Sequence, residues 1–93
     1  MELGHRDRVF EQAAALFGLL STPTRLRIVC MLMEGESKVS DLVDRLAVSQ
    51  SMMSQQLGVL HQSGILGRRR EGAQVFYRVD HEQVRSLCGA VVP

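Results

Sequence analysis

Two segments of this 93-residue chain have side chains suited to contacting nucleic acid. Residues 49–56, with the sequence SQSMMSQQ, hold three serines and three glutamines. Ser and Gln are neutral donors and acceptors that can hydrogen-bond to base edges in the major groove, whereas acidic side chains would repel phosphates. Serine is a poor helix former, which favours this interpretation over a merely polar, solvated helix face. The predicted base-contacting residues are Ser49, Gln50, Ser51, Ser54 and Gln55.

The second segment is basic and lies near the turn of a predicted hairpin. Residues 61–93 hold five arginines and three acids, whereas residues 1–60 hold six basic and seven acidic residues. The net charge of +1 is therefore the sum of a mildly acidic N-terminal region, residues 1–60, and a basic C-terminal region, residues 61–93. Arginine on a projecting hairpin can contact phosphates, which position a protein without specifying sequence. A solvated strand is the alternative interpretation. The predicted contacts of this segment are Arg68, Arg69, Arg70 and Gln74.

Other reactive residues give weaker signals. Cys30 and Cys88 are separated by 57 residues and form no CxxC pair, so neither a zinc ribbon nor a secreted disulfide framework is indicated. Two buried, reduced thiols are the simplest interpretation. The chain shows no Ser-His-Asp or Cys-His order, phosphate-binding Gly-rich loop or paired acids, so we expect neither an enzyme nor a cofactor.

Apolar spacing and capping residues predict the elements that position these side chains. The expected elements are helices over 8–20, 23–33, 39–46, 49–63 and 80–91, and strands over 65–70 and 75–79. Thr22, Ser49 and Asp80 are expected N-caps, and Gly64 is an expected left-handed stop. The third and fourth helices, joined by a short turn, form a helix-turn-helix beside a β-hairpin.

Length and composition limit the remaining possibilities. The chain has room for one domain, residues 1–93, and a domain this short often gains stability by oligomerising. No run of 18 or more apolar residues is present, and the N-terminus lacks the order of a signal peptide. We therefore expect a cytoplasmic protein with no membrane partner.

Segments 20–28, 46–60, 64–66 and 69–78 resemble, in order and spacing, the ArsR/SmtB winged-helix repressors of bacteria. The resemblance spans nearly the whole chain. It implies a mainly α winged helix-turn-helix with a small β-hairpin, in the order four helices, two strands and a fifth helix. It also implies a homodimer joined through the first and last helices that binds double-stranded operator DNA of twofold symmetry. The apolar faces of the helices over 8–20 and 80–91 agree with such a dimer.

The metal-sensing motifs of that family have no counterpart here. Where such members carry Cys-x-Cys, the sequence reads Lys38-Val39-Ser40. Asp80, His81 and Glu82 are adjacent and point in different directions from a helix, so they cannot close a tetrahedron around a metal. We expect no metal site.

A thiol-sensing branch of the family carries one cysteine on the second helix, where Cys30 lies, and another near the end of the last helix. Cys88 lies about two turns earlier, on the order of 12 Å along the helix axis. A disulfide needs Cα atoms within roughly 7 Å, so we expect no bond between Cys30 and Cys88 in one chain unless the last helix packs differently. A bond between subunits through Cys88 stays open.

The sequence thus favours a dimeric, sequence-specific DNA-binding regulator. We expect a repressor that is released from its operator by a signal, with oxidation or persulfidation of Cys30 and Cys88 as one hypothesis. An unknown small-molecule inducer, or constitutive repression, is the competing one. The alternatives of other classes are a winged-helix protein-interaction module that does not bind DNA and a metal-responsive repressor with an unrecognised site.

Overall fold

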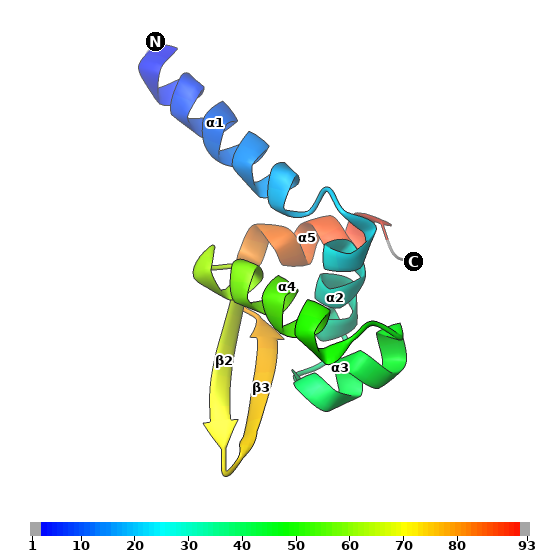
Figure 1. Ribbon diagram of the computed structural model, residues 1–93. Coiled ribbons are helices and arrows are strands. Elements are labelled where there is room, and N and C mark those ends of the chain that lie inside the picture. The colour runs from blue at the N-terminus through cyan, green and yellow to red at the C-terminus, as the bar shows by residue number, and fades with distance from the viewer. Residues whose placement is uncertain (1–2, 92–93) are drawn as a thin grey trace.

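Helices form most of the protein, and a small antiparallel sheet projects from them (Figure 1). The computed structural model describes the fold of residues 3–91 and the side-chain surroundings of residues 6–89, so the ends of the predicted domain, 1–2 and 92–93, lie outside it. The helices are α1 (Leu3–Leu19), α2 (Pro23–Met33), α3 (Val39–Leu46), α4 (Gln50–Gln62) and α5 (Glu82–Val91). The strands are β1 (Ser37–Lys38), β2 (Leu66–Glu71) and β3 (Gln74–Val79).

Local chemistry sets most of the helix boundaries, as predicted. The hydroxyl of Thr22 accepts a hydrogen bond from the backbone N–H of Arg25, and Pro23 occupies the first turn of α2, where its missing donor is not needed. The hydroxyl of Ser49 accepts from the backbone N–H of Met52 at 3.1 Å and caps α4. Gly64 has φ +88° directly after α4, which is the expected left-handed stop.

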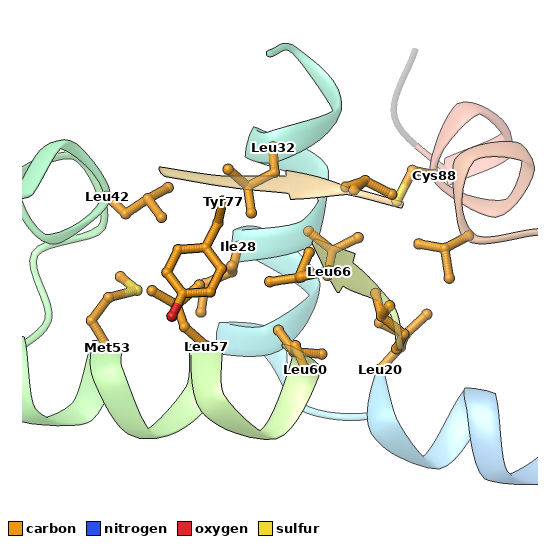
Figure 2. Packing of buried hydrophobic residues seen from close by; sticks show 14 residues of the cluster. Leu20, Ile28, Leu32, Leu42, Met53, Leu57, Leu60, Leu66, Tyr77 and Cys88 are labelled. Carbon is orange, nitrogen blue, oxygen red and sulfur yellow. The ribbon is translucent and has the colours of Figure 1, made fainter. Parts of the chain in front are cut away.

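The core lies where α2, α3, α4, α5 and the sheet meet. Ile28 and Val29 of α2 have no exposed surface, so α2 is the central buried helix. Figure 2 shows Tyr77 of β3 reaching toward Met53 and Leu57 of α4. The buried apolar residues are Leu20, Ile28, Val29, Leu32, Leu42, Met53, Leu57, Leu60, Ile65, Leu66, Tyr77, Val79, Val84 and Cys88.

The sheet differs from the predicted hairpin in two respects. It has a third strand, β1, and its strand order is β1-β3-β2. Two residues are too few to show an alternating pattern, so β1 leaves no periodic signal in the sequence. The hairpin turn is also shorter than the predicted four residues, because Glu71 and Gln74 pair and leave only Gly72 (φ +63°) and Ala73 between them.

The start of α5 corrects the prediction that Asp80 caps this helix. The N-cap position is His81, whose Nδ1 accepts a hydrogen bond from the backbone N–H of Val84 at 3.4 Å. Asp80 instead donates its backbone N–H to the carbonyl of Ile65 at 2.9 Å. This bond ties Asp80 to the residue before β2, just beyond the end of β3, and the helix starts after it.

Helix α1 extends away from the body of the domain, on the side opposite the hairpin (Figure 1). It begins earlier than predicted, at Leu3 rather than residue 8. Its apolar side chains Val9, Phe10 and Phe17 are 50%, 70% and 57% exposed. No single helix within residues 3–91 is long and apolar enough to cross a membrane; α1 and α2 together have that length and composition but are bent by 95° at their break.

Candidate nucleic-acid interface and thiol pair

Helix α4 is anchored by one face and presents the other to solvent. Met53, Leu57 and Leu60 are fully buried and recur at helical spacing. The short turn that sets α4 beside α3 contains Ala47, which has φ +54° and ends α3 in the left-handed conformation. The residues predicted to contact bases lie opposite the buried face and are all exposed: Ser49, Gln50, Ser51, Ser54 and Gln55.

Part of this exposed face borders a groove that continues onto the hairpin. Gln50 and Ser54 of α4 and Gln74 of β3 line a hollow of about 410 Å³. An adjoining hollow of about 430 Å³ shares Ser54 and is lined by Arg68, Arg69 and Arg70 of β2. Six of the predicted contact residues, from segments far apart in the sequence, therefore meet along one polar and basic groove. Ser49, Ser51 and Gln55 lie on the exposed face of α4 without lining either hollow.

The same groove includes a residue that sequence reasoning missed. Lys38, the only lysine of the chain, lines the hollow beside Gln50. It is the last residue of β1 and directly precedes α3. Its nearest charged neighbours in sequence, Glu36 and Asp41, are acidic, so the sequence shows no basic cluster there, and the pairing of β1 with β3 brings Lys38 to the groove.

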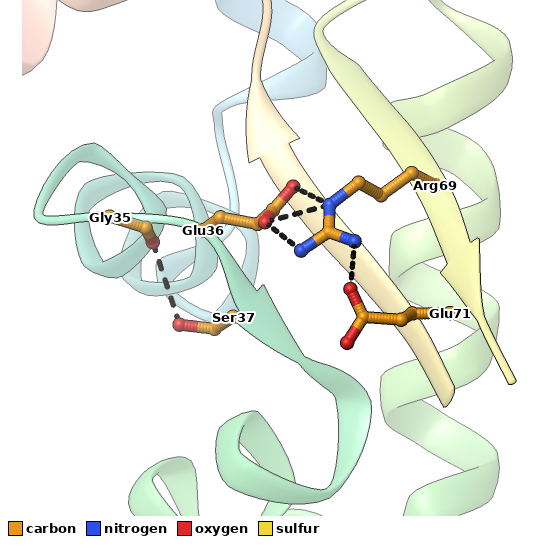
Figure 3. A network of polar contacts seen from close by, with 5 residues as sticks. All are labelled: Gly35, Glu36, Ser37, Arg69 and Glu71. Carbon is orange, nitrogen blue, oxygen red and sulfur yellow. Dashed lines mark hydrogen bonds and ion pairs between the residues drawn. The ribbon is translucent and has the colours of Figure 1, made fainter. Parts of the chain in front are cut away.

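The guanidinium of Arg69 lies between two carboxylates (Figure 3). Its guanidinium pairs with Glu36, with Nη2 at 2.8 Å from Oε1, and with Glu71, with Nη1 at 2.7 Å from Oε2. Its Cζ also lies 4.6 Å from the centre of the Phe76 ring. Hydrogen bonds to Glu36 and then Glu71 raise the pKa of Arg69, and the hydrogen bond from Arg69 lowers the pKa of Glu36.

Arg25 connects α4 to the end of α1. Its Nε donates to Oε1 of Gln56 at 2.7 Å, and its Nη1 donates to the carbonyl of Leu19 at 3.4 Å. Gln56 belongs to the Ser/Gln segment, yet this bond turns it toward α2 rather than the exposed face. No local pattern in the sequence indicates this contact, because its partners are 31 positions apart.

The two cysteine thiols are adjacent, which corrects the expectation that they are too far apart to bond. Sγ of Cys30 on α2 lies 3.3 Å from Sγ of Cys88 on α5. The prediction rested on the position of Cys88 along the last helix and on an assumed packing of that helix. The point where α5 crosses α2 decides instead which residues of the two helices touch. Cys30 is partly buried and Cys88 is buried, and both are free thiols.

The two thiols differ in burial, and burial affects the acidity of Cys88. Burial, followed by the hydrogen bond with Cys30, raises the pKa of Cys88 from 9.0 to about 12. Cys88 is therefore a neutral thiol at physiological pH. Within residues 6–89, no three His, Cys, Asp or Glu side chains lie close enough together to hold a metal ion.

Comparisons with known proteins agree with this architecture. The family model "Bacterial regulatory protein, arsR family" matches residues 22–67, which run from the cap of α2 into β2. The chain is 42% identical over 80 residues to the biofilm growth-associated repressor of Xylella fastidiosa, covering 86% of this chain and 70% of that protein.

Two solved structures extend the likeness to three dimensions. Reduced HlyU from Vibrio cholerae superposes with a TM-score of 0.91 at 31% identity, covering 96% of this chain and 94% of HlyU. The homodimeric winged helix-turn-helix domain Mb0332 from Mycobacterium bovis superposes with a TM-score of 0.81 at 26% identity, covering 98% of this chain and 84% of Mb0332. This chain therefore belongs to the arsR family of bacterial regulatory proteins and is a DNA-binding transcription regulator of the winged helix-turn-helix class.

Proposed function

We propose that this protein is a homodimeric repressor that binds a twofold-symmetric operator through α4 and the hairpin. The observation that carries the proposal is the groove that joins Gln50 and Ser54 to Arg68, Arg70 and Gln74. Neutral amides and hydroxyls on the helix suit base edges, and arginines on the hairpin suit the flanking phosphates. One side chain set would thus specify sequence while the other supplies affinity.

The exposed apolar face of α1 supports the dimer. Leu16 and Phe17 of α1 and Leu87 of α5 line an apolar groove of about 320 Å³. Three large apolar side chains of α1 are at least half exposed, and a second copy of the chain would remove them from water. The related Mb0332 domain is a homodimer, which also supports a dimer here. Twofold symmetry then places two recognition helices about one DNA turn, roughly 34 Å, apart.

The DNA proposal is tested by incubating the purified protein with random genomic fragments and sequencing those it retains. We expect a palindromic motif with half-sites roughly 10 base pairs apart. Replacing Gln50 and Ser54 by alanine should cost about 1–3 kcal/mol of discrimination at specific base positions. The matched control is Gln62→Ala at the far end of α4, which should leave the motif unchanged. If no motif is recovered, the protein-interaction module becomes the better explanation.

We also propose that the operator is released when Cys30 and Cys88 are oxidised. Hydrogen peroxide suits the geometry: the Cys30 thiolate attacks one oxygen, the O–O bond breaks, and a sulfenic acid and hydroxide form. The hydroxide takes up the proton that the Cys30 thiol lost and becomes the first water. The Cys88 sulfur then attacks the sulfenic sulfur, the S–S bond forms, and the oxygen leaves as water. Two thiols and one peroxide give one disulfide and two waters. The 3.3 Å separation of the thiols supports this step.

The route from the thiols to the DNA face would run through α2. Cys30 is on α2, which also carries Arg25, and Arg25 holds Gln56 of α4. A disulfide that draws α5 toward α2 would thus act on the helix that contacts the recognition helix. This part of the proposal is tested by measuring operator affinity after peroxide, after an organic persulfide and after re-reduction. Affinity should fall and recover in wild type but not change in Cys30→Ser, and equal affinity in every state would refute it.

A further inference from the structure

The three consecutive arginines of β2 occupy two faces of the sheet. The register pairs Arg68 with Tyr77, Arg69 with Phe76 and Arg70 with Val75. Successive side chains of a strand point to opposite faces. Arg68 and Arg70 therefore share the face of Tyr77 and Val75, which borders the groove beside α4. Arg69 also lines that hollow, but its guanidinium lies over the ring of its partner Phe76, on the other face of the sheet.

Arg69 also lies where the sheet narrows. Lys38 of β1 pairs with Phe76, and Phe76 pairs with Arg69, so all three strands are present at this level. Beyond it, toward Gly72, only β2 and β3 continue. An isolated two-stranded hairpin is marginally stable in water, so the orientation of this projecting end depends on what holds its base.

The contacts of Arg69 connect the strands at the level where the hairpin leaves the three-stranded part of the sheet. Its Nε donates to both carboxylate oxygens of Glu36 at 3.0 Å, and Nη2 lies 2.8 Å from the same group. Glu36 immediately precedes β1, so the ion pair joins the two outer strands over β3 (Figure 3). Glu71 engages the remaining edge of the guanidinium at 2.7 Å. Two carboxylates thus surround one positive charge.

We infer that Arg69 is a positioning residue that braces the hairpin, while Arg68 and Arg70 supply its phosphate contacts. This inference rests on the proposed function and assigns different roles to the three arginines of β2. A phosphate approaching Arg69 would meet two carboxylates and one guanidinium. The local net charge is therefore negative and would repel the phosphate. Within the described part of the chain, neither Arg68 nor Arg70 forms an ion pair, so their charges are available at the groove.

The salt dependence of operator binding separates the two roles. Each phosphate contact contributes about 0.9 to the slope of log affinity against log salt, so one arginine lost from each protomer of a dimer lowers it by about 1.8. We expect this decrease for Arg68→Gln and Arg70→Gln. Arg69→Gln should leave the slope unchanged and weaken binding roughly 3- to 10-fold at every salt concentration, because a hairpin no longer held must be ordered on binding.

Glu36→Gln is the decisive variant, because the two roles predict opposite signs. If Arg69 braces the hairpin, Glu36→Gln should bind DNA more weakly, by about as much as Arg69→Gln. The double variant should then show no further loss of affinity. A phosphate contact predicts tighter binding, because Arg69 is freed and a negative charge is removed. Glu34→Gln is the matched control: it removes the same charge two residues away, from an exposed side chain paired only with Arg45 in the described residues. Tighter or unchanged binding by Glu36→Gln, or a smaller slope for Arg69→Gln, would overturn the inference.

A second measurement tests the brace without DNA. Amide hydrogen exchange at residues 70–75 of the reduced protein should be faster in Arg69→Gln and in Glu36→Gln than in wild type or Glu34→Gln, with α2 unchanged. Equal exchange in all four proteins would overturn the brace. If the variants show these differences in exchange but the wild-type protein binds no operator, the proposed function fails while the role of Arg69 in holding the hairpin stands.

Discussion

Oxidation of the reduced protein should close a disulfide within one chain and stabilise its fold. The Sγ atoms of Cys30 and Cys88 are 3.3 Å apart, about 1.3 Å more than an S–S bond of roughly 2.0 Å. Small adjustments of α2 and α5 close that gap. The bond would join residues 58 apart in sequence and so restrict the unfolded chain strongly.

The size of the effect follows from that separation. For a loop of 58 residues, the chain-entropy model gives about 4 kcal/mol of stabilisation at 25 °C. For a domain of this size, each kcal/mol shifts the melting temperature by roughly 4–8 °C, so the upper bound is a rise of roughly 15–30 °C. Strain in the folded state or residual structure in the unfolded chain reduces the rise.

The assay compares urea and thermal unfolding of the reduced and oxidised protein at equal protein concentration, because a dimer's apparent stability depends on concentration. Cys30→Ser is the control, and its stability should not respond to oxidation. A denaturing non-reducing gel should show a monomer that migrates faster after oxidation. A covalent dimer, or an oxidised protein no more stable than the reduced one, would refute the reasoning.

Three further predictions concern the dimer, a cap and a titration. Phe17→Asp should convert the dimer to a folded monomer in sedimentation, because Phe17 is 57% exposed on one chain and contributes little to its core; an unchanged dimer would place the interface elsewhere. Ser49→Ala should lower the free energy of unfolding by about 1 kcal/mol in urea titrations, because it removes the cap on Met52, whereas exposed Ser51→Ala should change it by less than about 0.5 kcal/mol. The reduced protein should lose stability as pH rises from about 9 toward 12, because the unfolded chain releases the Cys88 proton while the folded chain keeps it; Cys88→Ala should lose less over that window.

Features governed by neighbours in sequence could be predicted. The cap at Ser49, the proline at the start of α2 and the left-handed Gly64 each depend on a few adjacent residues. The buried stripe of α4 follows from helical spacing alone, and the same spacing leaves Gln50 and Ser54 on the exposed side. For these reasons the helix-turn-helix and its exposed polar face were predicted with boundaries close to those observed.

Features set by pairing between distant segments could not be predicted. The strand β1 exists only because Ser37 and Lys38 pair with β3, and this pairing brings Lys38 to the groove. The contact of Cys30 with Cys88 depends on where α5 crosses α2, which no spacing along either helix encodes. The hydrogen bond of His81 that begins α5 depends likewise on Asp80 being held by Ile65.

The run of three arginines shows why a charge pattern is weaker evidence than the placement of each charge. Of the basic side chains near the sheet, Arg69 is held by two carboxylates and Arg78 lies 3.8 Å from Asp80. Fields of exposed charges decay over about 8 Å at physiological salt, so distant arginines add little at a given phosphate. The unpaired charges beside the exposed face of α4 are therefore those of Arg68, Arg70 and Lys38, which form no ion pair within the described residues. A net charge of +1 is compatible with DNA binding because these three charges gather at one groove.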